Sequence, residues 1–461
     1  MKRPADRRRW PVVVLPLVLA LIVVAGGATY ALGWVDHWRG TDVPPTPPAP
    51  QLSLAPVAVG ATQIAAAHRG GRPKADAVRR ALSGLLKSKR FGKRVHAVVA
   101  PLSGKSVFTL DTRPATPAST TKLLTTTAAL QVLGPDRRFT TSVAQQGARV
   151  TLVGGGDPLL SRSDLSALAS AAAEKLRAAG VRAVRLGYDT SLFSGPSVSP
   201  EWPKTYLPED VVAPISALSV DEGHEPGPDG ELGTGDDTRS TDPAGDAARV
   251  FAKALAKAGV KVKGAPVARA SRGSVIASRE SEPLGLIVEH TLQLSDNEAA
   301  EILARQTGLK VGTGGSFTGG VQAIVKTLGK LGVPADEIHL YDGSGLSRKD
   351  LISPLAIADV LQIAASHAEA SAVLSGLPVA GFKGSLATRF DDDSPSVTLG
   401  DVRAKTGTLT GVHALAGIVR DTQGTPMIVV VMADRVPPDG ALDAREALDE
   451  AMSAIATCRC S

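Results

Sequence analysis

The hydrophobic pattern of the 461-residue chain begins with an unbroken apolar run, since no charged residue occurs from Trp10 to Val35. As a helix, this run would span about 39 Å at ~1.5 Å per residue, more than the ~30 Å hydrocarbon core of a bilayer. Residues 1–9 carry five cations and one carboxylate. Because flanking cations stay in the cytoplasm, we expect residues 10–35 to be an uncleaved, single-pass signal anchor in the plasma membrane, with residue 36 onward exported. A cleaved signal peptide is the alternative, and it exports the same part of the chain.

Prolines interrupt every periodic pattern in the next segment, residues 36–74. Six of them fall between Pro44 and Pro56, which excludes a helix and predicts an extended, semi-rigid linker. From Ala75 onward, helical and alternating periods return. The predicted helices cover residues 77–86, 118–133, 164–179, 244–258, 284–292, 298–306, 319–331 and 441–456. The predicted strands cover residues 96–102, 106–111, 149–153, 184–187, 402–409, 412–420 and 427–433.

The middle of the chain differs from its flanks, because residues 143–284 alternate short strands with helices. This pattern predicts an inserted α/β domain, and residues 75–142 and 285–461 would then form one discontinuous domain. The insertion contains an acidic stretch from Asp221 to Asp246 that is rich in Gly and Pro. Its carboxylates lack the regular spacing of a calcium loop, so we interpret it as a solvated surface loop.

Composition and charge exclude several classes of protein. A chain with 43% hydrophobic and 21% charged residues is neither disordered nor collagen-like. Four of its six net positive charges lie within residues 1–9, so the rest has no basic surplus of the size that a nucleic-acid-binding domain needs. The two cysteines, Cys458 and Cys460, cannot join distant segments. A local disulfide, metal binding in trans and reduced thiols all remain open, whereas a structural zinc site would need further ligands nearby.

The first candidate for chemistry is Ser119-Thr120-Thr121-Lys122, at the start of a predicted helix. Residues three apart share a helix face, so the Lys122 ammonium can lie beside the Ser119 hydroxyl. Burial near the positive end of the helix would lower the pKa of Lys122 and let it accept the serine proton. A helix start with a serine in its first turn is the simpler interpretation of this motif alone.

The second candidate is Ser295-Asp296-Asn297, between two predicted helices. On a tight turn, Ser295 and Asn297 can both point into a cleft, where one relays a proton and the other binds an amide. These residue types also suit a helix cap. However, Asn297 is the only asparagine in the chain, which indicates a demand for its amide that a capping role does not explain.

The third candidate is Lys405-Thr406-Gly407-Thr408, on a predicted strand. Gly407 would let a ligand approach the backbone, Lys405 would attract an anion, and the two hydroxyls would bind a carboxylate. Each of the three motifs is weak evidence alone. Together, in this order and in these helix, turn and strand contexts, they form the motif set of penicillin-recognising serine enzymes.

From about residue 90 onward, the sequence resembles the penicillin-binding D-alanyl-D-alanine carboxypeptidases, and specifically their class C low-molecular-mass group of actinobacterial type. The resemblance extends beyond the three motifs to further segments at residues 117–122, 154–158, 295–301, 342–348 and 380–390. The resemblance implies that Ser119 is the acylated nucleophile and Lys122 its general base. Ser295 would pass the proton to the departing D-alanine, and Asn297 would bind the peptide carbonyl. The backbone N–H groups of Ser119 and Thr408 would form the oxyanion hole.

The resemblance also implies residues that bind the substrate. Lys405, with Thr406 and Thr408, would hold the terminal carboxylate. Asp157 and Arg348 match positions that contact the side chain of the stem-peptide diamino acid in some relatives. Neither a metal nor a cofactor is implied.

The expected fold is therefore multi-domain α+β and β-lactamase/transpeptidase-like: an antiparallel sheet flanked by helices, an all-helical lobe and the inserted domain. The expected function is that of a membrane-tethered serine carboxypeptidase that trims peptidoglycan stem peptides through an acyl-enzyme, binds β-lactams and has D,D-endopeptidase action as a second activity. A β-lactamase is one alternative, although no suitably placed deacylating glutamate stands between the first two motifs. A catalytically idle cell-wall scaffold is the other.

Overall fold

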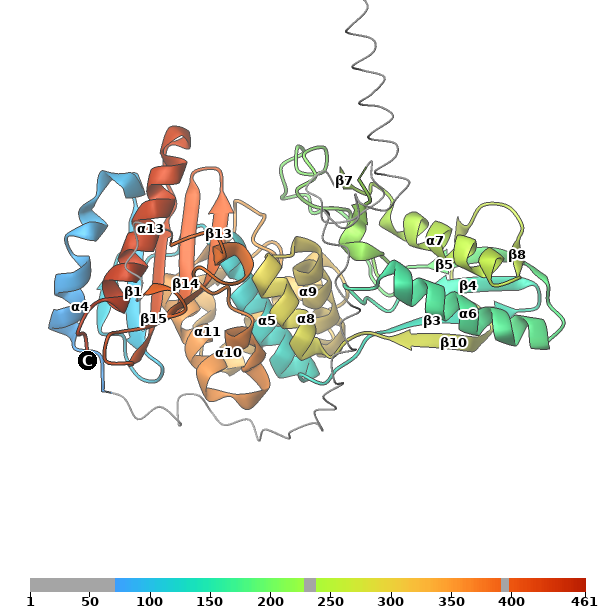
Figure 1. Cartoon of the computed structure of the whole chain (residues 1–461), viewed down its shortest axis with the longest axis horizontal. Helices are drawn as coiled ribbons and strands as arrows, with labels where there is room; N and C mark the ends of the chain where they lie inside the picture. The colour runs from blue at the N-terminus through green and yellow to red at the C-terminus, as the bar shows by residue number, and fades with distance from the viewer. Residues whose placement is uncertain (1–70, 228–237, 391–397) are drawn as a thin grey trace, which may run out of the picture. The chain divides into compact units, whose positions relative to one another are not determined.

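The computed structural model describes residues 71–227, 238–390 and 398–461 (Figure 1). The predicted basic head, signal anchor and linker up to residue 70 lie outside the described residues, as does part of the acidic stretch. Within the described ranges, no helix has the length and apolar character that a membrane span requires. The anchor therefore stays a prediction from the sequence.

A five-stranded antiparallel sheet forms the centre of the first region, in the order β13-β14-β15-β1-β2. Its strands are β1 (Val95–Pro101), β2 (Phe108–Leu110), β13 (Val402–Leu409), β14 (Val412–Arg420) and β15 (Pro426–Ala433). Val95 pairs with Ala433, so an N-terminal strand lies beside the C-terminal hairpin. The predicted antiparallel sheet, built from strands near both ends of the domain, is confirmed.

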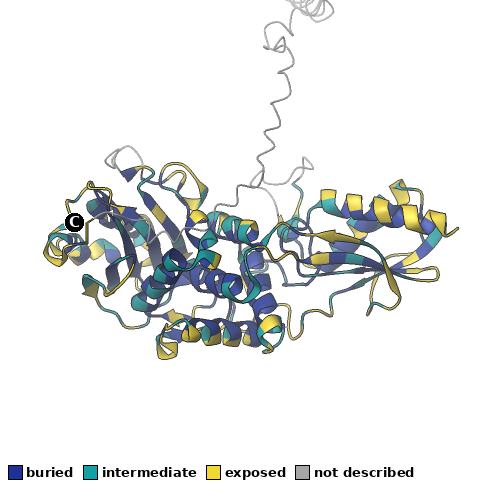
Figure 2. Ribbon diagram, turned by 90° about the horizontal axis from the view of Figure 1, so that it is seen from below, coloured by how far each residue is buried: buried dark blue, intermediate teal, exposed yellow. Residues whose placement is uncertain are grey.

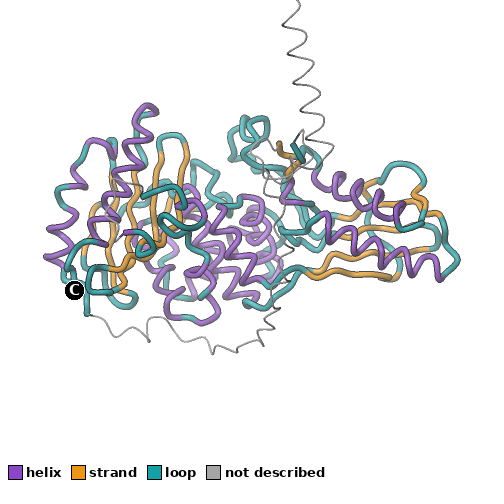
Figure 3. The backbone as a smooth tube through the Cα atoms, viewed as in Figure 1, coloured by secondary structure: helices purple, strands orange, loops and turns teal. Residues whose placement is uncertain are grey.

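Helices cover both faces of this sheet because its strands are apolar on both sides. Val98 and Val430 pack into one core with helices α5 (Thr121–Leu133), α8 (Leu284–Leu294) and α11 (Pro354–Ser366). Val99 and Val429 face the opposite way and pack with α4 (Ala75–Leu82) and α13 (Ala441–Ala456). Figure 3 shows the resulting layers of helix, sheet and helix.

The helical layer continues into a lobe that positions the chemistry. Helix α9 (Asn297–Val311) packs against both α5 and α10 (Phe317–Lys330). The packing of α9 on α5 places two of the motif-bearing helix starts close together. The remaining short elements are α12 (Ala372–Ser375), β6 (His224–Glu225), β7 (Thr238–Arg239), β11 (Ile338–His339) and β12 (Leu351–Ile352).

A second sheet lies between the first and second motifs in the chain. Its order is β10-β3-β4-β5-β8, and β9 also pairs with β5. The strands are β3 (Thr140–Gln146), β4 (Arg149–Val153), β5 (Ala183–Asp189), β8 (Lys261–Val262), β9 (Val267–Ala268) and β10 (Ser274–Glu280). Helices α6 (Arg162–Ala178) and α7 (Pro243–Lys257) bury one face, while the other face carries no helix of the described chain (Figure 2). The domain boundaries at residues 143 and 284 stay predictions.

Two predicted helices differ in detail from the structure. The helix expected over residues 77–86 ends at Leu82, and a separate 3₁₀ turn follows at Leu85–Lys87, because Gly84 interrupts the run. The helix expected over residues 118–133 begins with a 3₁₀ turn, η3 (Ala118–Thr120), before α5.

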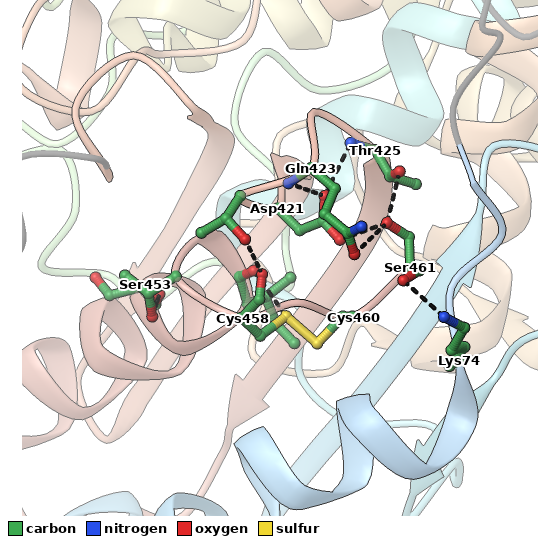
Figure 4. The surroundings of a disulfide bond; sticks show 11 residues. Lys74, Asp421, Gln423, Thr425, Ser453, Cys458, Cys460 and Ser461 are labelled. Carbon is green, nitrogen blue, oxygen red and sulfur yellow. Dashed lines mark hydrogen bonds between the residues drawn. A yellow bond between two sulfur atoms is a disulfide. The ribbon is translucent and has the colours of Figure 1, made fainter.

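The two cysteines form a disulfide with each other, Cys458–Cys460, so the first of the three open options is the one observed (Figure 4). Hydrogen bonds hold the tail around it. The Ser461 hydroxyl donates to Asp421 Oδ2 at 2.8 Å, and Lys74 Nζ donates to the Ser461 carbonyl at 2.9 Å. The C-terminal tail is thus fixed beside the residue that precedes α4.

Candidate active site

The first motif lies on η3 and the first turn of α5. Lys122 Nζ donates a hydrogen bond to Ser119 Oγ at 3.0 Å, as the spacing of three residues predicts. Ala118, just before the serine, has a φ of 48°, in the left-handed region that residues with a Cβ rarely adopt. Strain of this kind persists only where the surrounding structure imposes it.

Gly345 supplies part of that surrounding structure. Its φ is 84°, and a Cβ added there would lie 2.0 Å from the Ala118 carbonyl oxygen. A side chain at this position would therefore push the segment that carries Ser119 out of place.

We expect Gly345→Ala to lower the free energy of unfolding by about 1–3 kcal/mol and to impair acylation of Ser119. Urea unfolding and the rate of penicillin labelling measure the two effects. Gly329→Ala in α10 is the matched control, because a Cβ there meets no atom within 4 Å. Equal effects of the two substitutions would contradict the steric argument.

Lys122 is fully buried and makes two further hydrogen bonds. Its Nζ donates to Asn297 Oδ1 and to the Ser344 carbonyl, both at 2.8 Å. Burial lowers the pKa of Lys122 to about 8, although the carboxylates of Asp342 and Asp296 act in the opposite direction. Near neutral pH, part of the protein therefore has a neutral lysine within reach of the serine hydroxyl.

Two buried carboxyl groups hold the loop that supplies the Ser344 carbonyl. Glu301 on α9 accepts hydrogen bonds from the backbone N–H groups of Gly343 and Ser344 at 2.8–3.0 Å. Asp342 accepts from the N–H groups of Ser344, Gly345 and Ser347 and from Trp202 Nε1 at 2.7 Å. Burial and the charge of Asp342 raise the pKa of Glu301 to about 8. These two carboxyl groups thus orient Lys122 through the loop.

The sequence assigned no role to Glu301, Asp342 or Ser344. The sequence indicated a role for them only in that the segments 295–301 and 342–348 belong to the family resemblance. Their role in holding the loop depends on contacts that no local pattern reveals.

The second motif forms the tight turn between α8 and α9. Ser295 adopts a left-handed conformation with a φ of 60°, and Asp296 caps α9 by accepting from the Ala299 N–H at 2.9 Å. Asn297 also donates from Nδ2 to the Val211 carbonyl at 3.0 Å. A primary amide has two N–H bonds, so one of them remains for the substrate carbonyl that Asn297 is expected to bind.

A partly buried polar cluster lies next to this turn. His290 Nε2 and Glu222 Oε1 are 2.9 Å apart, and Asp296 lies beside both. Burial and the charge of Glu222 raise the pKa of Asp296 well above its ordinary value. Within the described part of the chain, these three side chains place metal-ligand atoms close together, but His290 and Glu222 already bond to each other directly. The cluster joins the loop at Glu222 to the second motif.

The third motif lies on β13, at one edge of the main sheet. Lys405 is fully buried, and its Nζ donates to Ser295 Oγ at 2.8 Å and to the Thr406 carbonyl at 2.9 Å. Burial, and secondarily the positive charge of Lys122, lower the pKa of Lys405 well below its ordinary value. Thr406 Oγ1 and Ser385 Oγ are 2.8 Å apart, so Ser385 joins the site although the sequence assigned it no role.

The edge of β13 also places backbone groups beside η3. A Cβ at Gly407 would lie 2.7 Å from the Pro117 carbonyl oxygen, so glycine lets the strand pack on η3. The Ala404 N–H bonds outward to the Pro378 carbonyl. Because backbone groups alternate along a strand, the N–H of Thr408 points to the same outer edge. This is the direction that an oxyanion hole shared with Ser119 requires.

The two residues expected to contact the diamino acid lie on different segments of the chain. Asp157 is buried, accepts from the Leu159 N–H at 3.0 Å, and has its pKa raised to about 6 by burial. The segment just before it contacts α9, since Gln306 Nε2 donates to the Gly155 carbonyl at 2.7 Å. Arg348 is exposed and follows the Asp342 loop. Their roles stay predictions.

Comparison with known proteins identifies the family. The model of the D-Ala-D-Ala carboxypeptidase 3 (S13) family matches residues 79–226 and 228–455. The chain belongs to this family. Carboxypeptidase DacB of Mycolicibacterium smegmatis is 32% identical, with 99% of this chain and 99% of the relative covered. The D-alanyl-D-alanine carboxypeptidase of Actinomadura sp. strain R39 is 31% identical, with 67% of this chain and 71% of the relative covered.

Solved structures support the fold. Penicillin binding protein 4 of Haemophilus influenzae matches with a TM-score of 0.67 and 21% identity, covering 80% of this chain and 98% of that protein. The same protein complexed with a β-lactam matches with a TM-score of 0.62. The predicted family, fold class and serine-type carboxypeptidase activity are thereby confirmed in preference to a β-lactamase or an idle scaffold.

Proposed function

We propose that this S13 peptidase removes the terminal D-alanine of peptidoglycan stem peptides through an acyl-enzyme on Ser119. The observation that carries the proposal is the contact of Ser119 Oγ with a buried lysine of lowered pKa. Neutral Lys122 takes the serine proton while Oγ attacks the carbonyl of the penultimate D-alanine. The N–H groups of Ser119 and Thr408 stabilise the oxyanion, and water later hydrolyses the ester.

The contact between Lys405 and Ser295 supports a role for both in the departure of D-alanine. The leaving amine needs a proton, and Ser295 Oγ accepts a hydrogen bond from Lys405 Nζ at 2.8 Å. Lys405, with the hydroxyls of Thr406 and Thr408, would bind the substrate's terminal carboxylate. A β-lactam carries a carboxylate and a reactive carbonyl in a similar arrangement, so we infer that it acylates Ser119 as well.

The location and the range of substrates are also proposals. The apolar run at residues 10–35 and the cations before it support a membrane anchor with the catalytic domain on the cell-wall side. Cleavage of D,D-cross-links uses the same chemistry on a larger leaving group, so we propose endopeptidase activity at the same site.

Release of D-alanine from a synthetic stem pentapeptide tests the proposed function. The purified protein should release one D-alanine per peptide and should become covalently labelled by fluorescent penicillin. A cross-linked dimer of the same peptide measures the endopeptidase activity in parallel. Absence of both products and of labelling would overturn the proposal.

The pKa of Lys122 predicts the pH dependence of the reaction. The general base must be neutral, so kcat/KM for pentapeptide should rise with pH and level off above about pH 8. An ordinary lysine, with a pKa near 10.5, would place the rise more than two pH units higher. Initial rates measured from about pH 6 to about pH 10 distinguish these cases. A profile that is flat through about pH 8 would contradict the assignment of Lys122.

A further inference from the structure

The second sheet has one open face with an unusual charge pattern. The even positions Val150, Val184 and Leu186 are buried against α6 and α7, so the odd positions of these strands point to the opposite face. Two of those odd positions, Arg149 and Arg185, are exposed and pair directly across parallel strands.

The row of cations continues onto the next strand. Ala183 pairs with Lys261, and Lys263, two residues further on, donates its N–H to the Val184 carbonyl. Lys263 therefore lies opposite Arg185, so that three cations stand in one line across β4, β5 and the residue that follows β8. Neighbouring strands are about 4.8 Å apart, and like charges at this spacing repel one another.

A further cation lies flat on the same face. The side chain of Arg269 crosses Gly187, where an added Cβ would be only 2.3 Å from Arg269 Cδ. Glycine at this position thus admits the arginine side chain.

Nothing in the described part of the chain neutralises the row. No described carboxylate lies within ion-pair distance of Arg149, Arg185 or Lys263. The acids that begin α6 and α7 are already engaged, since Asp164 pairs with Arg279 and Asp246 pairs with Arg249. The exported domain is close to neutral overall, so positive charge is concentrated on this face.

The face is also hollowed. A cavity of about 460 Å³ is lined by Gln146, Arg149, Ala183, Arg185 and Lys263. Guanidinium groups form bidentate hydrogen bonds with phosphate oxygens. A line of cations suits a polymer with repeating anionic groups better than a single small anion. A hollow fits a polymer segment better than the flat surface of a bilayer.

We propose that this basic face of the inserted domain binds a linear phosphodiester polymer of the cell envelope, and so holds the enzyme against the wall. The choice of an envelope polymer rests on the proposed function, because it assumes that the domain works where peptidoglycan is cleaved. The binding itself is independent of the catalytic residues.

The test uses the purified full chain and polyglycerol phosphate of about twenty repeats with a fluorescent end label. Fluorescence anisotropy should detect binding that weakens as salt increases. The triple variant Arg149→Gln, Arg185→Gln, Lys263→Gln should bind roughly 10- to 100-fold more weakly. It should still release D-alanine from soluble pentapeptide at the wild-type rate, which shows that it is folded.

A matched control removes the same charge from the helical side of the domain. Lys175, Lys253 and Lys257 are exposed on α6 and α7, and their triple replacement by Gln should leave binding within about twofold. Equal losses in both variants would overturn the proposal, because net charge alone would then explain the binding.

Two other outcomes would overturn the proposal. One is no binding of the polymer by the wild type at low salt. The other is binding of phosphatidylglycerol vesicles in place of the polymer, which would assign the face to a membrane surface. Polymer binding without D-alanine release would leave this inference standing and refute the proposed function instead.

Discussion

Ser119→Ala should abolish both D-alanine release and penicillin labelling. The substitution removes the hydroxyl that Lys122 Nζ contacts at 3.0 Å, and no covalent intermediate can form without it. We expect kcat/KM for pentapeptide to fall by at least roughly 10³-fold, as is usual when a nucleophile that acts together with its base is removed. Mass spectrometry of the protein after incubation with penicillin should show no adduct.

Ser385→Ala is a suitable control for this loss. Ser385 also belongs to the site, but it contacts Thr406 and not the lysine that activates the nucleophile. Its loss should raise KM while the protein still forms the penicillin adduct. An adduct of undiminished yield on the Ser119 variant would refute the assignment of the nucleophile.

Lys122→Met should have the second largest effect. Methionine has a similar length and no basic nitrogen, so acylation loses its general base, an effect usually worth 10²–10⁴-fold. The substitution also leaves the Asn297 Oδ1 and Ser344 carbonyl acceptors without a donor that now lies at 2.8 Å from each. Stopped-flow measurement of penicillin acylation gives the rate directly.

Thermal unfolding separates the chemical role of Lys122 from a structural one. Unpaired buried acceptors cost about 1–3 kcal/mol each, so the melting temperature of Lys122→Met should fall while the protein remains folded. Glu301→Gln, which perturbs the same loop but keeps the lysine, should slow acylation far less. If the two variants slow acylation equally, Lys122 acts only by holding the loop.

The contacts that the sequence could predict are the local ones. The contact of Ser119 with Lys122 follows from the spacing of three residues on a helix, and it is observed. The contacts of Lys122 with Asn297 and of Lys405 with Ser295 depend on how α9 packs on α5 and where β13 ends. The family resemblance anticipated a shared site, but spacing alone could not.

Among the longer elements, one helix and two strands were not predicted from the sequence, and each omission has a physical reason. Helix α11 is buried around most of its circumference, so it lacks the polar stripe that marks an amphipathic helix. Its start did carry a signal, because Ser353 caps the helix and Pro354 occupies the first turn. Strand β3 is rich in Thr, Ser and Gln, and strand β10 is largely exposed. In both, the alternation of apolar and polar residues is therefore weak.

The pairing of β1 with β15 affects how the protein is made. These two strands are more than 300 residues apart in the chain, so β1 must wait for a partner that is synthesised much later. Until then an apolar strand has an unpaired edge, which is a state prone to aggregation and dependent on chaperones. Strand β13, which carries the third motif, is also synthesised late. A chain without it can neither cleave peptide nor bind a β-lactam at the site. Synthesis of β13 and β15 therefore precedes any catalysis.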